Sequence, residues 1–289
     1  MRGSGHEPVM VAEVIEYLGG RGTVLDMTLG AGGHAQALLE SGVERLVGVD
    51  RDPDAIAMAM ERLSRFGERF TAVSARFSDM PAENRVDGVL YDLGVSSMQL
   101  DRPERGFSYR QPGPLDMRMG GGDEEGETAA DLVNTASEEE LARIVFEYGE
   151  ERRSRRIAAA IVRARARKPI ETTDELARVV AGALGANRGG PHPARRTFQA
   201  LRIAVNRELE ELAASLPRAA SVLAPGGRIV VISYHSLEDR ITKRFLLSDP
   251  SLRVLTKKVV RPSAAEASRN PRARSARLRA AEEPTEEAA

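Results

Sequence analysis

The sequence predicts an α/β protein with a Rossmann-like sheet that is interrupted by an inserted all-helical domain. Short apolar runs alternate with amphipathic stretches between residues 23 and 92, a pattern typical of βαβ units around a parallel sheet. Helical patterns then fill residues 128–216, and a strand-like run returns after the turn at Pro225. These observations indicate a sheet domain built from two separate parts of the chain.

Strands are expected in three apolar runs of the first part. The runs TVLDM, RLVGVD and VDGVLYDLG begin at Thr23, Arg45 and Val86. Amphipathic helices are expected nearby, at residues 35–41 and 53–66. Because the crossovers between parallel strands are right-handed and short, these runs should lie side by side in one sheet.

The inserted domain is expected to begin within a loop rich in Gly, Pro, Asp and Arg at residues 100–126. Ser137 and Thr173 are expected at the N-terminal caps of helices beyond it. The division that follows gives residues 1–110 and 216–280 to the two parts of the sheet domain, 111–215 to a helical substrate-recognition domain, and 281–289 to a disordered tail.

The composition is that of an ordinary globular protein, with 42% hydrophobic and 29% charged residues. No apolar run is long enough to cross a bilayer and no signal peptide is recognised, so we expect no membrane partner and a cytoplasmic location. The net charge of -1 gives no overall attraction to a polyanion. The absence of cysteine excludes disulfides, thiolate zinc sites and cysteine nucleophiles.

A glycine-rich loop at Gly30-Ala-Gly-Gly-His34 follows the first strand and opens a helix, as in nucleotide-binding proteins. Asp50, at the tip of the second strand, suits the ribose hydroxyls of either NAD or S-adenosylmethionine. Asp26 favours S-adenosylmethionine, because a carboxylate there suits the methionine ammonium and sits badly beside a pyrophosphate. A purely structural turn with a solvated Asp50 is the remaining alternative.

Asp92 ends a third apolar run. Ligands of open α/β sheets bind beyond the carboxyl ends of the strands, so Asp26, Asp50 and Asp92 are expected to face one crevice. The alternative is that Asp92 only caps a turn.

The chain resembles the bacterial 16S ribosomal RNA cytosine-N4 methyltransferases, the MraW or RsmH family, nearly from end to end. The blocks that carry the resemblance include His6-Glu-Pro-Val-Met, Gly30-Ala-Gly-Gly-His34, Asp92-Leu-Gly-Val-Ser-Ser-Met-Gln-Leu-Asp101, Gly113-Pro-Leu-Asp-Met-Arg-Met119, Tyr148-Gly-Glu-Glu-Arg152 and Ile232-Ser-Tyr-His-Ser-Leu-Glu-Asp-Arg240. Two small departures are Met98, where the family usually has proline, and Tyr234, where it usually has phenylalanine.

The resemblance implies a class I methyltransferase sheet, S-adenosylmethionine as the methyl donor, and 16S ribosomal RNA of the small ribosomal subunit as substrate and partner. The donor contacts that it implies come from Gly32, Gly33, His34, Asp50, Phe77, Asp92 and Gln99. The sequence leaves a homodimer and a magnesium requirement open.

The reaction that the resemblance implies is methylation of an exocyclic amine, whose nitrogen lone pair is delocalised into the ring. Asp92, or a backbone carbonyl of residues 93–95, is the hypothetical acceptor for the amino proton. Other amino-methylating enzymes carry an acid followed by Pro-Pro-aromatic at this place. In this chain no such sequence follows Asp92. Methylation at carbon 5 of a pyrimidine is disfavoured, because that reaction ordinarily needs a cysteine adduct.

The remaining candidates concern the RNA. His34 is expected to make a backbone or donor contact, and His235 either contacts the base or braces the crevice. Spacing of the histidines predicts no metal site. Phe107 either stacks on a flipped cytosine or closes the insertion against the sheet domain, and Arg195 and Arg196 are expected to contact the substrate.

Two segments concentrate positive charge. Residues 152–168 contain eight basic residues and no acid, and residues 257–279 contain eight opposed only by Glu266. The first segment either binds phosphates or is the solvated face of an amphipathic helix. The second is expected to bind phosphates, because it offers few apolar residues for docking.

Two other functions remain open from the residues alone. The chain could methylate a protein or a small molecule, although the basic segment near its end argues against this. It could also be a catalytically silent donor-binding or ribosome-assembly factor.

Overall fold

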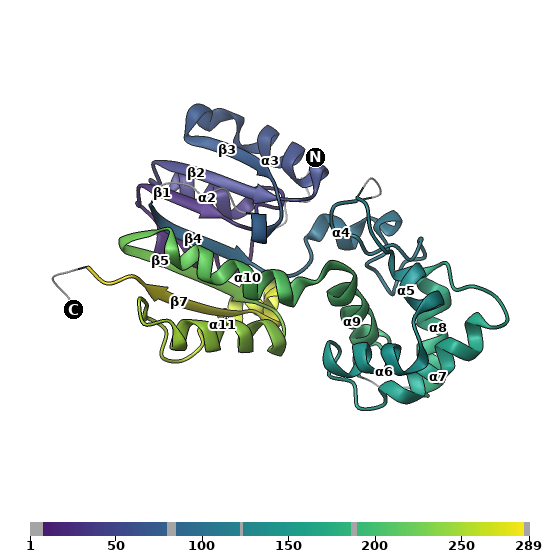
Figure 1. Ribbon diagram of the computed structural model, residues 1–289. Coiled ribbons are helices and arrows are strands. Elements are labelled where there is room, and N and C mark those ends of the chain that lie inside the picture. Colours follow the sequence, from purple (N-terminus) through teal and green to yellow (C-terminus); the bar gives the residue numbers. More distant parts are fainter. Residues whose placement is uncertain (1–7, 80–84, 122–123, 186–189, 286–289) are drawn as a thin grey trace. The chain divides into compact units, whose positions relative to one another are not determined.

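The computed structural model describes residues 8–79, 85–121, 124–185 and 190–285, and divides into two compact units (Figure 1). The sheet unit comprises residues 1–94 and 209–289, and the helical unit comprises residues 95–208. The helical unit is thus an insertion between two parts of the sheet unit, as the sequence predicts. Among the described residues, no helix combines the length and apolar character that crossing a membrane requires.

The sheet has the strand order β3-β2-β1-β4-β5-β7-β6. The first five strands are parallel, and β7 runs antiparallel to both β5 and β6. This is the α/β, Rossmann-like architecture that the sequence predicts. The strands are β1 (Thr23–Asp26), β2 (Arg45–Asp50), β3 (Phe70–Ser74), β4 (Val86–Asp92), β5 (Leu223–Ser233), β6 (Arg253–Val254) and β7 (Arg277–Glu282).

Both faces of the sheet are buried, and strand residues alternate between two apolar cores. On β1, Val24 belongs to the core that contains α1 and α2, whereas Leu25 belongs to the core that contains α10. Leu90 and Tyr91 alternate in the same way on β4, as the two-residue period of a strand requires. The helices of this unit are α1 (Val11–Leu18), α2 (Gly33–Glu40), α3 (Pro53–Leu63), α10 (Glu208–Ser221), α11 (Ser236–Ser248) and α12 (Ala264–Arg269).

The helical unit has its own apolar core, formed by residues such as Ile144, Ile157 and Leu201. Several of its helices begin at Ser or Thr caps, whereas α7 and α9 have no side-chain cap. Ser137 accepts a hydrogen bond from a backbone N–H of α6, as predicted, and the next predicted cap lies one residue earlier, at Thr172. The helices are α4 (Ser97–Asp101), α5 (Ala129–Thr135), α6 (Glu138–Glu147), α7 (Ser154–Arg165), α8 (Thr173–Leu184) and α9 (Arg195–Asn206).

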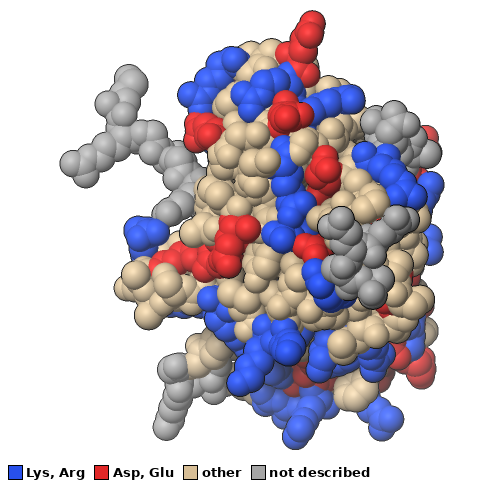
Figure 2. Space-filling model, turned by 90° about the vertical axis from the view of Figure 1, so that its left-hand side faces the viewer, with Lys and Arg blue, Asp and Glu red and all other residues tan. Residues whose placement is uncertain are grey.

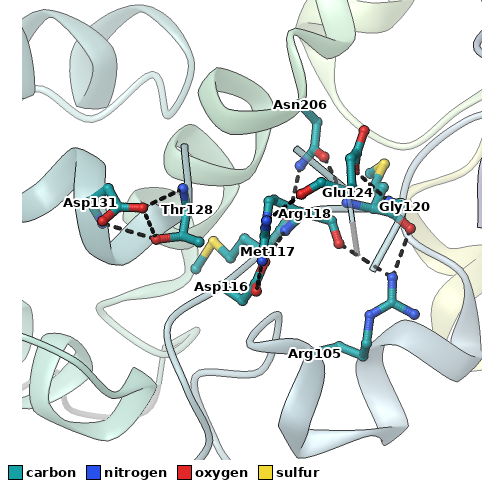
Figure 3. Close-up of polar contacts among 10 residues, drawn as sticks. Arg105, Asp116, Met117, Arg118, Gly120, Glu124, Thr128, Asp131 and Asn206 are labelled. Carbon is teal, nitrogen blue, oxygen red and sulfur yellow. Dashed lines mark hydrogen bonds and ion pairs between the residues drawn. The ribbon is translucent and has the colours of Figure 1, made fainter. Parts of the chain in front are cut away.

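A polar network fixes the loop that precedes α5 (Figure 3). Asn206 accepts a 2.9 Å hydrogen bond from the Met119 N–H and donates one of 2.7 Å to the Met117 carbonyl. Arg105 donates to the Met119 carbonyl at 2.7 Å. Met117 is fully buried with a φ of 65°, a conformation that side chains other than glycine adopt only when surrounding contacts enforce it. The network supplies these contacts.

The limits of the helical unit differ from the predicted 111–215. The unit begins at Val95 because Gln99 and Arg105 bond to the Met119 carbonyl within the same unit. It ends at Glu208 because Leu212 and the rest of α10 pack in a core of the sheet.

The chain end also differs from the prediction. Ala281 and Glu282, expected in a disordered tail, belong to β7, and residues 286–289 lie outside the described part of the chain. The expectation that residues 257–279 lack docking contacts is wrong, because small side chains fill the sheet core there. Ala273, Ala276 and Leu278 are fully buried.

Lys and Arg side chains are interspersed with Asp and Glu on the face drawn in Figure 2, and they are densest in the lower part of the picture. The near-neutral net charge of -1 therefore conceals local excesses of positive charge. Such excesses are what a contact with a polyanion requires.

Candidate active site

Three aspartates lie at the carboxyl ends of adjacent parallel strands. Asp26 ends β1, Asp50 ends β2 and Asp92 ends β4, and β1 pairs with both neighbours. Thr28 links two of them: its hydroxyl accepts a 2.6 Å hydrogen bond from the Asp92 N–H, and its own N–H donates to Asp26 at 3.1 Å. The structure therefore brings these residues to one edge of the sheet, as the strand pattern predicts.

The glycine-rich loop crosses this edge between β1 and α2. Gly32 has a φ of 76°, which favours glycine, and α2 begins directly after it. A Cβ on Gly32 would lie 3.1 Å from the Leu63 side chain, and a Cβ on Gly33 would lie 2.6 Å from Pro8. The packing around the loop therefore leaves little room for side chains at these two positions.

Asp26 is a fully buried carboxylate with one bonded oxygen. Its Oδ1 accepts from the Thr28 N–H, and its Oδ2 has no hydrogen-bond partner among the described residues. Burial raises the pKa of Asp26 to about 6, against the opposing effect of the charge of His34. A buried carboxylate oxygen without a donor is costly. Asp26 thus provides an acceptor for a cationic hydrogen-bond donor.

Asp50 is held by backbone N–H groups. Its Oδ2 accepts a 2.8 Å hydrogen bond from Gly30, and its Oδ1 accepts one of 2.9 Å from Asp52. Burial raises the pKa of Asp50, although both hydrogen bonds act in the opposite direction. Each oxygen retains a lone pair for a further donor, so the carboxylate is oriented without being saturated.

Asp92 lies between a tyrosine and a histidine. The Tyr234 hydroxyl donates a 2.7 Å hydrogen bond to Asp92 Oδ1, and His34 Nε2 lies 3.3 Å from Asp92 Oδ2. Burial lowers the pKa of His34, but the hydrogen bond and charge of Asp92 outweigh it and the net shift is upward. The Asp92 side chain is 23% exposed. It is therefore fixed in orientation and still accessible.

Two further predicted residues lie in the sheet unit. Phe77 is half-buried just beyond β3, and its ring stands edge-on to Tyr91 with the centroids 6.0 Å apart. His235 is the N-cap of α11, where its Nδ1 accepts from the Glu238 N–H and its Nε2 lies 3.1 Å from Glu238 Oε1. These contacts favour the bracing role for His235.

The other four candidates belong to the helical unit. Gln99 is buried and completes a capping box with Ser96 at the start of α4. Phe107 is only 5% exposed in the core of this unit, a position that offers no ring face to a base. Arg195 is exposed, and Arg196 is exposed with contacts to the Glu150 carbonyl and to Glu151.

Two residues of the site were not recognised from the sequence. Thr28 lies between β1 and Gly30, and its hydroxyl connects β1 to β4. Tyr234 follows β5, and Ile232 of β5 is in register with Asp92. Because β5 lies next to β4, the side chain directly after β5 can reach Asp92. Knowledge of the strand order would therefore have predicted this contact.

The sheet is parallel except for a reversed strand near one edge. A glycine-rich loop follows β1, and acids end β1, β2 and β4. Together these features define an S-adenosylmethionine-dependent methyltransferase. The sequence comparison agrees with this class. The chain belongs to the MraW methylase family, whose family model matches residues 3–284.

Relatives cover nearly the whole chain. The chain is 51% identical to ribosomal RNA small subunit methyltransferase H of Methylobacterium sp. (strain 4-46), over 98% of this chain and 92% of that protein. It is 53% identical to the protein of the same name from Gloeobacter violaceus, over 96% of this chain and 87% of that protein. An rRNA methylase structure from Streptococcus thermophilus matches with a TM-score of 0.45 and 10% identity, over 95% of this chain and 94% of that one.

Proposed function

We propose that this protein transfers a methyl group from S-adenosylmethionine to the exocyclic N4 amine of a cytosine in 16S ribosomal RNA. Membership of the MraW methylase family and the names of relatives about half identical in sequence support the substrate. The observation that carries the donor is the buried Asp26 carboxylate, whose Oδ2 has no partner among the described residues. Because the substrate is ribosomal RNA, we place the reaction in the cytoplasm.

The residues at the sheet edge fit the methyl donor. Asp26 Oδ2 would accept from the methionine ammonium, and Asp50 would accept from the ribose hydroxyls. The backbone at Gly32 and Gly33 approaches without side chains, and Phe77 offers an aromatic surface beyond β3 for the adenine. When bound, S-adenosylmethionine supplies a methyl group that is already activated by its sulfonium.

Asp92 is the residue that we assign to the amine. Methyl transfer forms a nitrogen–carbon bond as the sulfur–carbon bond breaks, and the nitrogen must then lose a proton. A lone pair on Asp92 can accept a hydrogen bond from the amine and then that proton, while Tyr234 and His34 fix the carboxylate's orientation. Holding the amine in line with the methyl group supplies much of the acceleration.

The chain contains no cysteine for an alternative route through carbon 5 of the pyrimidine. Methylation of the exocyclic amine needs no covalent adduct with the enzyme. Among the RNA contacts that the sequence predicts, exposed Arg195 and Arg196 and the capping His235 remain candidates. The burial of Phe107 argues against stacking on the cytosine.

Methyl-labelled S-adenosylmethionine and purified small ribosomal subunits that lack the modification test this function. We expect the label in the RNA, and nucleoside analysis should recover it as N4-methylcytidine. Label found only in protein would refute the proposal in favour of a protein methyltransferase. No label, with donor binding retained, would instead identify a silent donor-binding factor.

A further inference from the structure

The outer face of α7 carries a row of arginines. Helical periodicity places Arg152, Arg155, Arg156, Arg163 and Arg167 on one side of this helix and its flanks, and all five are exposed. The residues between them on that side are alanines. The opposite side packs Ile157, Ala158 and Ile161 into the core of the helical unit. We call these five residues the arginine row.

The arginine row differs from the other cations of the same segment, each of which has a partner within the protein. Arg153 contacts Glu151, Arg165 donates to the Val133 carbonyl, and Lys168 pairs with Glu175. No side chain of the arginine row has a hydrogen bond or ion pair with any residue that the structure describes. The positive charge of the row is therefore available to an external ligand.

The position of the arginine row on the helix is unfavourable for stability. Arg155 and Arg156 occupy the first turn of α7, which contains no acid, although the positive end of a helix dipole favours acids there. Neighbouring α6 and α8 follow that rule, with glutamates in the first turn of α6 and Asp174 with Glu175 in that of α8. A bound anion would remove this penalty.

We propose that the arginine row binds the phosphate backbone of the RNA substrate. The inference rests on the proposed function and adds the surface that holds the RNA. Within α7 the row extends about 12 Å from Arg155 to Arg163 at the rise of an α-helix, enough to reach successive phosphates, and Arg167 lies beyond the end of the helix. Arginine rather than lysine throughout suits this partner, since its planar guanidinium binds phosphate through paired hydrogen bonds.

A triple variant, Arg155→Gln, Arg156→Gln and Arg163→Gln, tests the proposal. Glutamine keeps the helix propensity and removes three positive charges. The matched control, Arg218→Gln, Lys243→Gln and Arg244→Gln, removes three exposed charges from α10 and α11 of the sheet unit. A third variant with lysine at 155, 156 and 163 keeps the charge. Circular dichroism and donor-binding calorimetry establish that each variant is folded.

The readout is the affinity for a 16S ribosomal RNA transcript as a function of salt concentration. Loss of three phosphate contacts should reduce the slope of log affinity against log salt by about 2, at ~0.7 per phosphate of single-stranded RNA. We expect this reduction, with at least tenfold weaker binding at physiological salt, for the glutamine triple alone. The lysine variant should keep the wild-type slope.

Equal slopes for the glutamine triple and wild type would overturn the inference. So would an unchanged RNA affinity of the triple together with loss of binding to vesicles of anionic phospholipid or to an acidic protein. Either result leaves methyl transfer to RNA by the wild type intact. Failure of the wild type to methylate small subunits would instead overturn the proposed function, which separates the two.

Discussion

The Tyr234 hydroxyl donates a 2.7 Å hydrogen bond to Asp92 Oδ1 across the ends of two paired strands, β5 and β4. The other oxygen of Asp92 lies 3.3 Å from His34 Nε2. The carboxylate is thus oriented from both sides, by a residue after β5 and by a residue in the first turn of α2. Its orientation depends on contacts that separate substitutions can remove one at a time.

Tyr234→Phe removes the hydroxyl and keeps the ring. We expect kcat to fall by roughly threefold to tenfold, the equivalent of about 1 kcal/mol for one hydrogen bond, because Asp92 becomes less constrained. Affinity for S-adenosylmethionine should stay within twofold in calorimetry, because the hydroxyl that is lost bonds to Asp92 and not to Asp26 or Asp50. Tyr17→Phe, in α1, is the matched control. Equal kcat for wild type and Tyr234→Phe would contradict a positioning role.

Asp92→Asn keeps the size of the side chain and removes its basicity. A positioned proton acceptor typically contributes 10²- to 10⁴-fold, so we expect kcat to fall at least about 100-fold at saturating donor. Single-turnover methylation of small ribosomal subunits measures this directly. Unchanged turnover would transfer the role to a backbone carbonyl of residues 93–95.

Asp26→Asn is expected to stabilise the donor-free protein at pH 8. The folded-state pKa of about 6 exceeds the ordinary value of 3.8, so ionised Asp26 opposes folding. Its favourable contribution is complete below pH 3.8 and is lost as the pH rises through about 6. The full difference corresponds to at most about 3 kcal/mol. Urea unfolding at pH 8 should show the gain, and it should shrink toward pH 4, whereas the exposed control Glu61→Gln should show neither effect.

Donor affinity should depend on pH through the same carboxylate. Asp26 must be ionised to accept from the methionine ammonium, so the affinity should fall by up to about tenfold per pH unit below about 6. The groups facing it are His34, Asp50 and Asp92. Calorimetry between pH 5 and 8 measures this dependence. An affinity that does not change over that range, or that Asp26→Asn retains, would show that Asp26 does not hold the ammonium.

Asn206→Ala tests the polar network of Figure 3. The substitution leaves the Met119 N–H and the Met117 carbonyl without their partner. We expect the free energy of unfolding to fall by about 2 to 6 kcal/mol, at roughly 1–3 kcal/mol for each buried polar group left unsatisfied. Gln36→Ala, which removes only an exposed contact with Glu40, should change it little. Equal melting temperatures for Asn206→Ala and wild type would refute this assignment.

The sheet and its acidic edge were predictable because the signals are local. Apolar runs that end in Asp26, Asp50 and Asp92 identify both the strands and the ends at which a ligand binds. The contacts around Asp92 were not predictable in the same way. Tyr234 is 142 residues from Asp92 in the chain, and only the order of the strands brings them together.

The end of the chain shows a second limit of sequence patterns. Ala281 and Glu282, expected in a disordered tail, complete the charged and weakly apolar run RLRAAE that forms β7. Its arginines are held by a tertiary contact, since Arg277 and Arg279 both pair with Asp239, and alanine suffices to fill the space against the sheet. The start of the insertion was also mispredicted. The loop there is held by hydrogen bonds to backbone groups, and such a loop shows no apolar periodicity in the sequence.

The insertion of residues 95–208 between β4 and β5 also sets the order in which a growing chain can fold. When the ribosome has made the first four strands, β4 is an unpaired edge, and its partner β5 emerges only after the whole insertion. The helical unit, built from contacts between neighbouring helices, can form during that interval. Until β5 emerges and pairs with β4, the nascent polypeptide carries an open strand edge, which can promote aggregation.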